Sequence, residues 1–229
     1  MNTVLRELDD IPVTVVVAIA WATLAVVCGM QGDPKIFAER TLQYGLLAPS
    51  LVVHGEAWRL FGYAFLHANV LHLLINLASL WTLGPALERS LGSVRFALLY
   101  IAAAIGGGIA VCLVYEPGQP VVGGSGALFG MLGAAVAINM RAGRHLFAFL
   151  EFEGPRRLLG SIGANFVLGL LLPFISNTAH AGGLVAGFAI TLLWLRPGAV
   201  TAGVWHWRAA TTALFGSLLF WSLVPVGRW

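Results

Sequence analysis

Five polar side chains in an otherwise apolar sequence have types that could do chemistry together: Ser125, His180, His67, His72 and Asn76. A serine hydroxyl is a weak nucleophile until a base takes its proton, and histidine is the usual base. His72 and Asn76 are four residues apart and share a face on a helix, whereas His67 points elsewhere. The set favours acyl transfer, with Ser125 as the nucleophile and His180 as the base.

Acyl transfer also needs hydrogen-bond donors for the negative charge that develops on the attacked carbonyl oxygen. The expected start of a helix at Ser125 supplies backbone amides at the positive end of the helix dipole. Small residues around the serine let a carbonyl approach: Gly123, Gly124 and Gly126. Asn76 and His72 could donate from a facing helix, so nucleophile, base and oxyanion donors are all present.

No acidic side chain is placed to complete a triad with His180. The ten carboxylates lie outside its apolar segment, at positions 7, 9, 10, 33, 39, 56, 88, 116, 151 and 153. Position 127 is alanine, so the segment also lacks the G-x-S-x-G pattern of soluble serine hydrolases. The sequence therefore predicts a Ser–His dyad that uses no cofactor. The absence of H-E-x-x-H and of aspartates within apolar segments argues against metalloprotease and aspartyl protease chemistry.

The composition indicates that lipid surrounds these residues. Hydrophobic residues make up 59% of the 229 positions and charged residues 10%, whereas soluble domains carry about 25% charged residues. A membrane-spanning helix needs about 20 mostly apolar residues. Seven segments meet or approach this length, at about 13–30, 66–86, 96–115, 125–140, 158–174, 178–195 and 209–226. The net charge of +3 comes from scattered arginines, which argues against a nucleic-acid partner.

The predicted topology is a single membrane-embedded domain over residues 1–229. Residues 1–12 form a cytoplasmic N-terminus, residues 31–65 an extracytoplasmic loop, and residues 196–229 a linker with an extra helix. With the N-terminus inside, nine Lys and Arg residues lie on the inner side and four on the outer side, as the positive-inside rule favours. Because 12 of the 13 basic residues are arginine, we expect a bacterial cytoplasmic membrane.

This topology places the polar side chains at a similar depth. The second, fourth and sixth segments all run from outside to inside, and each has its polar residues near the outer end. At about 1.5 Å of rise per residue, these groups lie within roughly 10 to 15 Å of one another in depth. Glycines four apart, such as Gly126 with Gly130 and Gly183 with Gly187, let two helices pack closely. We therefore expect Ser125 and His180 to come within hydrogen-bond reach.

With these residues in order, the sequence resembles the rhomboid family of intramembrane serine proteases over roughly residues 57–190. Trp58-Arg59 resembles the family's loop motif, and HANVLHLLIN its second-helix pattern, with His72 and Asn76 at the oxyanion positions. GGSG resembles the nucleophile motif G-x-S-G, and AHAGGLVAG the segment of the base histidine. The resemblance gives Glu88 a structural role, as it does Trp58, Arg59, His67, Gly126, Phe129, Gly183 and Gly187.

The resemblance implies an all-α, polytopic membrane bundle with a six-helix core and a seventh C-terminal helix. It implies hydrolysis of a peptide bond in or beside a transmembrane segment of a protein substrate, at a site that opens toward the outer face of the bilayer. Phe129 departs from the family's frequent tyrosine. A ring stacked under His180 survives that change, whereas a hydroxyl contact does not.

Other interpretations of the same residues stay open at this point. A serine at a helix start is often only a cap, and a membrane histidine often only makes an interhelical hydrogen bond. A catalytically inactive rhomboid-like binder of membrane proteins would share the scaffold. A small-solute transporter would account for the broken-looking fourth segment and for Gly106-Gly107-Gly108. A metal site built from His67, His72 and His180 is a further alternative. The substrate and the oligomeric state do not follow from the sequence.

Overall fold

The structure, a computed structural model, describes residues 10–114, 120–141 and 176–195, and most of these residues are helical. Within them the only extended pairing is an isolated bridge between Leu47 and Val121. The all-α prediction is therefore confirmed. The elements are α2 (Pro12–Cys28), α3 (Pro34–Gln43), α4 (Pro49–Val53), α5 (Arg59–Gly62), the 3-10 helix η1 (Tyr63–Phe65), α6 (Val70–Leu91), α7 (Ser93–Val114), α8 (Ser125–Arg141) and α10 (Asn177–Trp194).

Five of the seven predicted apolar segments correspond to helices, namely α2, α6, α7, α8 and α10. The second begins four residues later than expected, because the Asn69 side chain accepts a hydrogen bond from the His72 amide at 2.9 Å and caps α6 there. It also continues through Pro85 to Leu91. The predicted segments 158–174 and 209–226 lie outside the described residues, as do residues 1–9 and 196–229.

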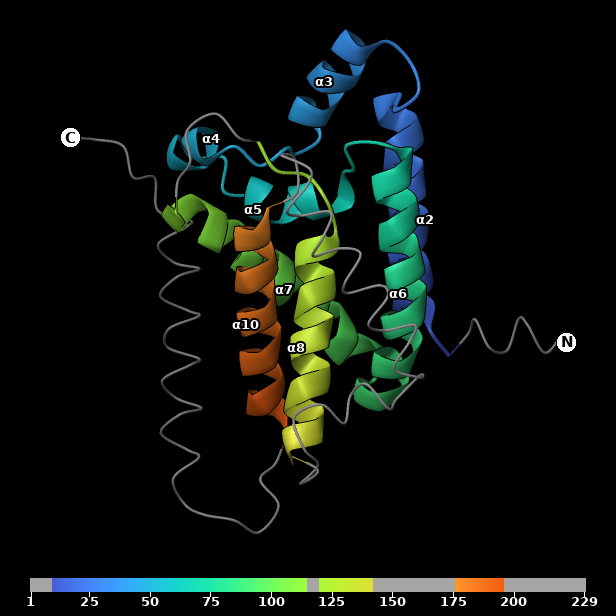
Figure 1. Cartoon of the computed structure of the whole chain (residues 1–229), viewed down its shortest axis with the longest axis vertical. Helices are drawn as coiled ribbons and strands as arrows, with labels where there is room; N and C mark the ends of the chain where they lie inside the picture. The colour runs from blue at the N-terminus through green and yellow to red at the C-terminus, as the bar shows by residue number, and fades with distance from the viewer. Residues whose placement is uncertain (1–9, 115–119, 142–175, 196–229) are drawn as a thin grey trace, which may run out of the picture.

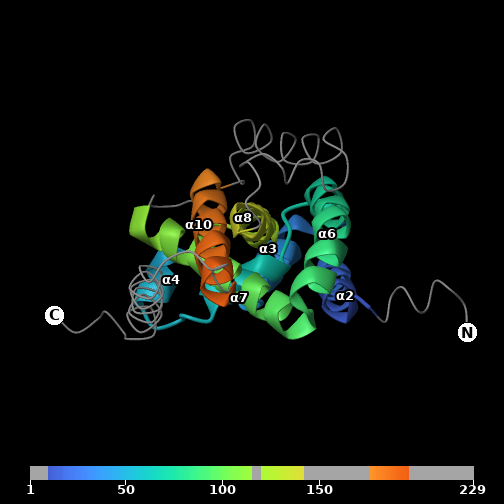
Figure 2. The same cartoon turned by 90° about the horizontal axis from the view of Figure 1, so that it is seen from below.

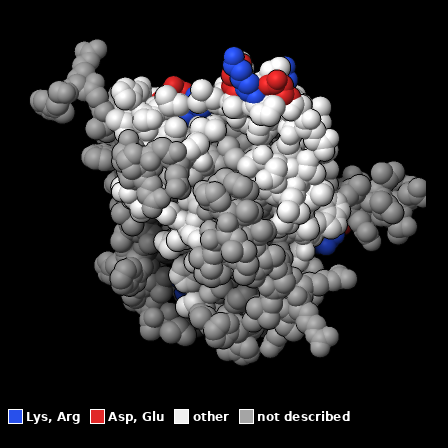
Figure 3. Space-filling view, turned by 45° about the horizontal axis from the view of Figure 1, so that its top comes forward, with Lys and Arg blue, Asp and Glu red and all other residues white. Residues whose placement is uncertain are grey.

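The outward surface of the described bundle is apolar, and its interior contains polar side chains. Among the described helices, α6 and α7 are long and apolar enough to cross a membrane, and α2 and α8 are shorter apolar helices. Val26, Val94 and Val185 are 79%, 75% and 64% exposed, whereas Asn76 and Glu88 are buried. On the face drawn in Figure 3, charged residues gather mainly at the top and most of the described surface is uncharged. This polarity suits a lipid surrounding.

Three helices form the tightest part of the bundle. α10 packs against both α8 and α7, and the three lie side by side in Figures 1 and 2. A Cβ atom added at Gly183 would overlap the carbonyl oxygen of Gly126, and one added at Gly187 would overlap that of Gly130. Backbone therefore meets backbone between α10 and α8, as the glycine spacing predicts.

Glu88 joins the start of α2 to the end of α6. The residue that precedes α2, Ile11, makes no capping bond with its side chain. The buried carboxylate of Glu88 instead accepts hydrogen bonds from the amides of Val13 and Thr14, at 2.9 and 2.8 Å, and from the Thr14 hydroxyl at 2.7 Å. Since the first amides of a helix have no partner within it, Glu88 caps α2 from another helix.

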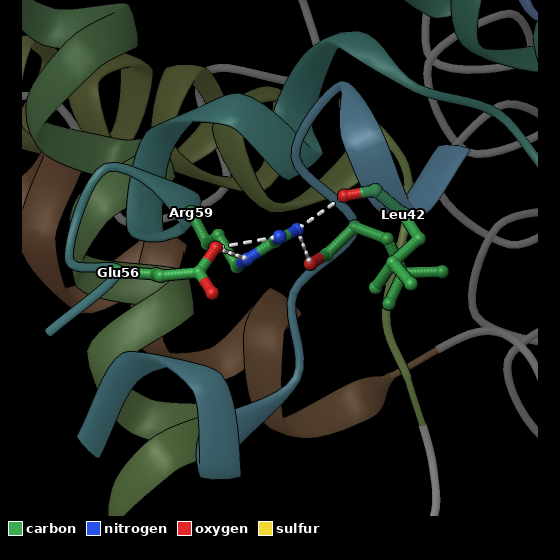
Figure 4. Close-up of polar contacts among 4 residues, drawn as sticks. Leu42, Glu56 and Arg59 are labelled. Atoms are coloured by element: carbon green, nitrogen blue, oxygen red, sulfur yellow. Dashed lines mark hydrogen bonds and ion pairs between the residues drawn. The ribbon is translucent and has the colours of Figure 1, made fainter. Parts of the chain in front are cut away.

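Residues 31–65, expected as a loop, fold into three short helices and a 3-10 turn. Arg59 holds them together: its guanidinium donates to the carbonyl oxygens of Leu42 and Leu46 at 2.6 and 2.9 Å and pairs with Glu56 at 2.6 Å (Figure 4). The same guanidinium lies 4.6 Å from the ring centre of Trp58. Four partners on one buried cation fix this segment above the helices.

Candidate active site

Ser125 and His180 lie in direct contact. Ser125 is the first residue of α8, and His180 lies in the first turn of α10, whose N-cap is Ser176. The His180 Nε2 atom lies 2.7 Å from the Ser125 Oγ atom, and the two side chains are 3% and 7% exposed. A hydroxyl and an imidazole at this distance share a hydrogen bond, which is the geometry for transfer of the hydroxyl proton to the ring.

Phe129 fixes the plane of the His180 ring. It lies one helical turn after Ser125, and the two rings are stacked with centres 4.2 Å apart and planes 8° apart. The other ring nitrogen of His180, Nδ1, has no hydrogen-bond partner among the described residues. In the part of the chain described, the orientation of the base therefore comes from aromatic packing and not from a carboxylate.

The backbone before Ser125 passes closely beside His72. Gly123 has φ of +135°, a conformation that side-chain-bearing residues rarely adopt. A Cβ atom there would lie 2.7 Å from the His72 ring and 3.7 Å from the Ser125 hydroxyl. A Cβ atom at Gly124 would overlap the Trp21 indole. Only glycine fits at these two positions. Because Gly123 has no side chain, the His72 ring can pack against the backbone close to Ser125.

The polar residues in the first two turns of α6, His72 and Asn76, are buried in the bundle. Asn76 is fully buried, and neither atom of its amide group has a hydrogen-bond partner among the described residues. His72 is 5% exposed. A buried amide without a partner costs free energy, so its retention suits a group that binds something else. Asn76 and His72 are thus both buried on α6, and the His72 ring lies beside Gly123, two residues before the serine.

His67 packs against Trp21 and His72. Its ring makes edge contacts with the rings of Trp21 and His72, with centres 5.0 and 5.2 Å apart. It is 2% exposed, and neither ring nitrogen has a partner in the described segments. Those segments also hold no group of three or more His, Cys, Asp or Glu residues that could bind a metal ion.

Three aromatic residues near the site were not foreseen from the sequence. Trp21 donates from its indole nitrogen to the Ala64 carbonyl at 3.0 Å and to the Tyr100 hydroxyl at 3.1 Å. Tyr63 donates to the Ala104 carbonyl at 2.9 Å. All three aromatic side chains are buried. Each is an aromatic residue with a polar tip within or beside an apolar segment, and this is the feature of the sequence that indicates a buried hydrogen bond.

The fold and the site together define an α-helical membrane protein with a buried serine–histidine pair at the meeting point of two tightly packed helices. The family model for the rhomboid domain matches residues 54–197, which include Ser125, His180, His72 and Asn76. The chain belongs to the rhomboid family.

Relatives with this domain occur in bacteria and plants. The chain is 37% identical over 158 residues to "Rhomboid protease GluP" of Bacillus subtilis, a match that covers 66% of this chain and 28% of the relative. It is 38% identical over 158 residues to "RHOMBOID-like protein 5" of Arabidopsis thaliana, covering 67% and 49%. It is 38% identical over 143 residues to "Putative rhomboid protease YdcA" of Bacillus subtilis, covering 62% and 69%. The chain thus spans half or less of the first two relatives.

Proposed function

We propose that the protein is an intramembrane serine endopeptidase that cleaves transmembrane segments of membrane proteins through a Ser125–His180 dyad. The observation that supports this most is the 2.7 Å contact between the Ser125 hydroxyl and the His180 imidazole, both buried in a membrane bundle. Family membership and relatives named as proteases support the same reaction class.

The reaction proceeds through an acyl-enzyme. His180 takes the proton of the Ser125 hydroxyl as its oxygen attacks the carbonyl carbon of the scissile peptide bond. The protonated imidazole then gives that proton to the leaving amine. A water molecule, deprotonated by the same ring, attacks the ester carbonyl and releases the second product with Ser125 restored.

The negative charge of the tetrahedral intermediate is stabilised by donors that converge on the serine. The amide group of Asn76 donates one N–H, and the His72 ring donates another in the tautomer that protonates the nitrogen facing the substrate. The first amides of α8, which begins at Ser125, have no partner within the helix and add further donors. Asn76 has no competing partner among the described residues, so its donors are available to the substrate.

The substrate is a helix that must unwind locally. A peptide bond in a helix is hydrogen-bonded on both sides, and lipid replaces none of those bonds. A substrate segment with glycine or proline near the cleaved bond lowers the cost of unwinding. We propose that the protein, a single domain over residues 1–229, crosses the bacterial cytoplasmic membrane several times with its N-terminus inside. The dyad then lies near the outer face, where water can enter.

The test is proteolysis by the purified protein in liposomes, with a fluorogenic single-span substrate that contains a glycine–alanine stretch. Wild-type protein cleaves the substrate, whereas Ser125→Ala and His180→Ala leave it intact while they retain the unfolding temperature of the wild type. An inactive rhomboid-like binder would co-purify with the substrate without cleaving it. Cleavage by Ser125→Ala at the wild-type rate would rule out the assigned nucleophile.

A further inference from the structure

Tyr63 is the first residue of the 3-10 turn η1, which precedes α6. Its side chain is 1% exposed, and its hydroxyl donates to the Ala104 carbonyl of α7 at 2.9 Å. A Cβ atom at Gly107, on the same helix, would lie 2.6 Å from this hydroxyl. The absence of a side chain at Gly107 thus makes room for the Tyr63 hydroxyl against the surface of α7.

The same hydroxyl reaches the residues adjacent in sequence to Ser125 and His180. A Cβ atom at Gly126 would lie 3.0 Å from the Tyr63 hydroxyl and 3.3 Å from the Ala179 carbonyl oxygen. A Cβ atom at Gly107 would lie 2.8 Å from that same carbonyl oxygen. Tyr63, α7, α8 and α10 therefore meet at one close-packed junction, one residue away from each member of the pair.

The main chain of Tyr63 is bonded to the backbone that precedes Ser125. Its carbonyl oxygen accepts a hydrogen bond from the Gly123 amide at 3.0 Å. Gly123 is the residue with φ of +135°, two positions before Ser125, beside the His72 ring. Tyr63 thus bonds the backbone before the serine and packs beside Gly126 after it. The Ala179 carbonyl of α10 adjoins the same two glycines, Gly107 and Gly126.

We propose that Tyr63 is a positioning residue that sets the Ser125–His180 distance through its hydroxyl. This inference rests on the proposed function and extends it. The hydrogen bond to Ala104 fixes the position of the Tyr63 ring along α7. The hydroxyl then limits how closely α8 and α10 approach α7. Proton transfer depends steeply on the separation of donor and acceptor, so a small shift at this junction changes the rate of attack by Ser125.

Tyr63→Phe removes the hydroxyl and leaves the ring and the carbonyl in place. The matched control is Tyr100→Phe, because the Tyr100 hydroxyl is also buried and also donates to a backbone carbonyl, that of Ala64, at 2.9 Å. The Tyr100 hydroxyl contacts Trp21 and Ala64 and neither member of the pair. Tyr63→Phe loses one buried neutral hydrogen bond, whereas Tyr100→Phe loses the bond to Ala64 and the bond from Trp21. The unfolding temperature of the control therefore falls at least as far as that of Tyr63→Phe.

The readouts are the rate of labelling by a fluorophosphonate probe and the kcat and KM for the single-span substrate, on the monodisperse fraction of each variant. We expect Tyr63→Phe to lower the labelling rate and kcat on the order of tenfold, with KM unchanged, because the nucleophile is misplaced and substrate binding is not. We expect the labelling rate and kcat of Tyr100→Phe to stay within about twofold of the wild type. This change is smaller than the net free energy of one hydrogen bond would produce.

A second variant tests the contact itself. Gly126→Ala adds a methyl group against the Tyr63 hydroxyl, so it lowers the labelling rate more in the wild-type background than in Tyr63→Phe, where space has been made. The positioning role would be overturned if Tyr63→Phe were labelled as fast as Tyr100→Phe and the wild type. It would also be overturned if the effects of the Tyr63 and Gly126 changes were independent of each other. Absence of any labelling of the wild type at Ser125 would overturn the proposed function instead.

Discussion

The His180 Nε2 atom lies 2.7 Å from the Ser125 Oγ atom although 55 residues separate the two in sequence. The contact depends on the close approach of α8 and α10, where the carbonyl oxygens of Gly126 and Gly130 occupy the space that side chains at Gly183 and Gly187 would need. A hydrogen bond between two short side chains near helix ends requires this backbone separation. The glycines are therefore part of the site.

Gly187→Ala is expected to separate the pair without touching either member. The added methyl group would overlap the Gly130 carbonyl, which is backbone and moves only with its helix. We expect cleavage to fall by more than about tenfold, and overpacking to lower the free energy of unfolding by about 1–3 kcal/mol. Cleavage kinetics and thermal unfolding in detergent measure the two effects.

Val185→Ile is the matched control on the same helix, since it also adds one carbon but to a side chain that is 64% exposed. Its activity and unfolding temperature should equal those of the wild type. An unchanged Gly187→Ala enzyme would show that the separation of the helices does not set the geometry of the pair.

Asn76→Ala removes an amide donor from the proposed oxyanion site. We expect kcat to fall by about 10²–10³, with little change in KM, because the donor acts mainly on the charge of the tetrahedral intermediate. The buried amide group has no partner among the described residues, so its removal costs no hydrogen bond there, and any loss of stability comes from the cavity left by the shorter side chain. Leu74→Ala, at an exposed position of the same helix, is the control. A rise in KM with constant kcat would instead assign Asn76 to substrate binding.

Phe129→Leu removes the ring that stacks on His180 and keeps the apolar volume. The imidazole then samples other orientations, and we expect kcat to fall on the order of tenfold, the scale of one lost aromatic contact of about 1.4 kcal/mol. Phe129→Tyr keeps the stacked ring and should retain activity. Equal rates for the leucine and tyrosine variants would mean that stacking does not orient the base.

Glu88→Ala leaves three donors at the start of α2 without their acceptor. We expect the free energy of unfolding to fall by at least about 3 kcal/mol, because each buried donor without a partner costs about 1–3 kcal/mol. Glu88→Gln retains one acceptor oxygen and should fall between the alanine variant and the wild type. Denaturant titration in detergent gives this order. Wild-type stability of Glu88→Ala would show that α2 needs no cap from α6.

The contact between Ser125 and His180 could be anticipated because three local sequence patterns together predict it. The length of the apolar segments predicts the helices, and polar residues near the ends of alternate helices predict that these side chains share a depth. Glycines four apart predict that two of the helices pack closely. The apolar lengths also predict a helical membrane protein, whereas the arrangement with a six-helix core and a seventh helix is what the resemblance to the rhomboid family implies. The bounds of α6 did not, because its start depends on a cap by Asn69 that an apolar window does not register.

The sequence does not show which aromatic residues support the site, because a buried and a lipid-facing aromatic residue look alike within an apolar segment. Trp21 is fully buried against Gly124, whereas Trp81 is 53% exposed, yet both are tryptophans within apolar helices. In soluble proteins the contrast between polar and apolar faces separates such residues, and in lipid both faces are apolar. The same reasoning applies to Tyr63.

The most direct test of the central claim is to locate the adduct of a fluorophosphonate probe by mass spectrometry on the purified protein. Activation of Ser125 by His180 predicts a single adduct on Ser125 in the wild type, lost in Ser125→Ala and reduced by orders of magnitude in His180→Ala. An adduct on any other serine, or labelling of Ser125 at an equal rate without the His180 imidazole, would contradict it.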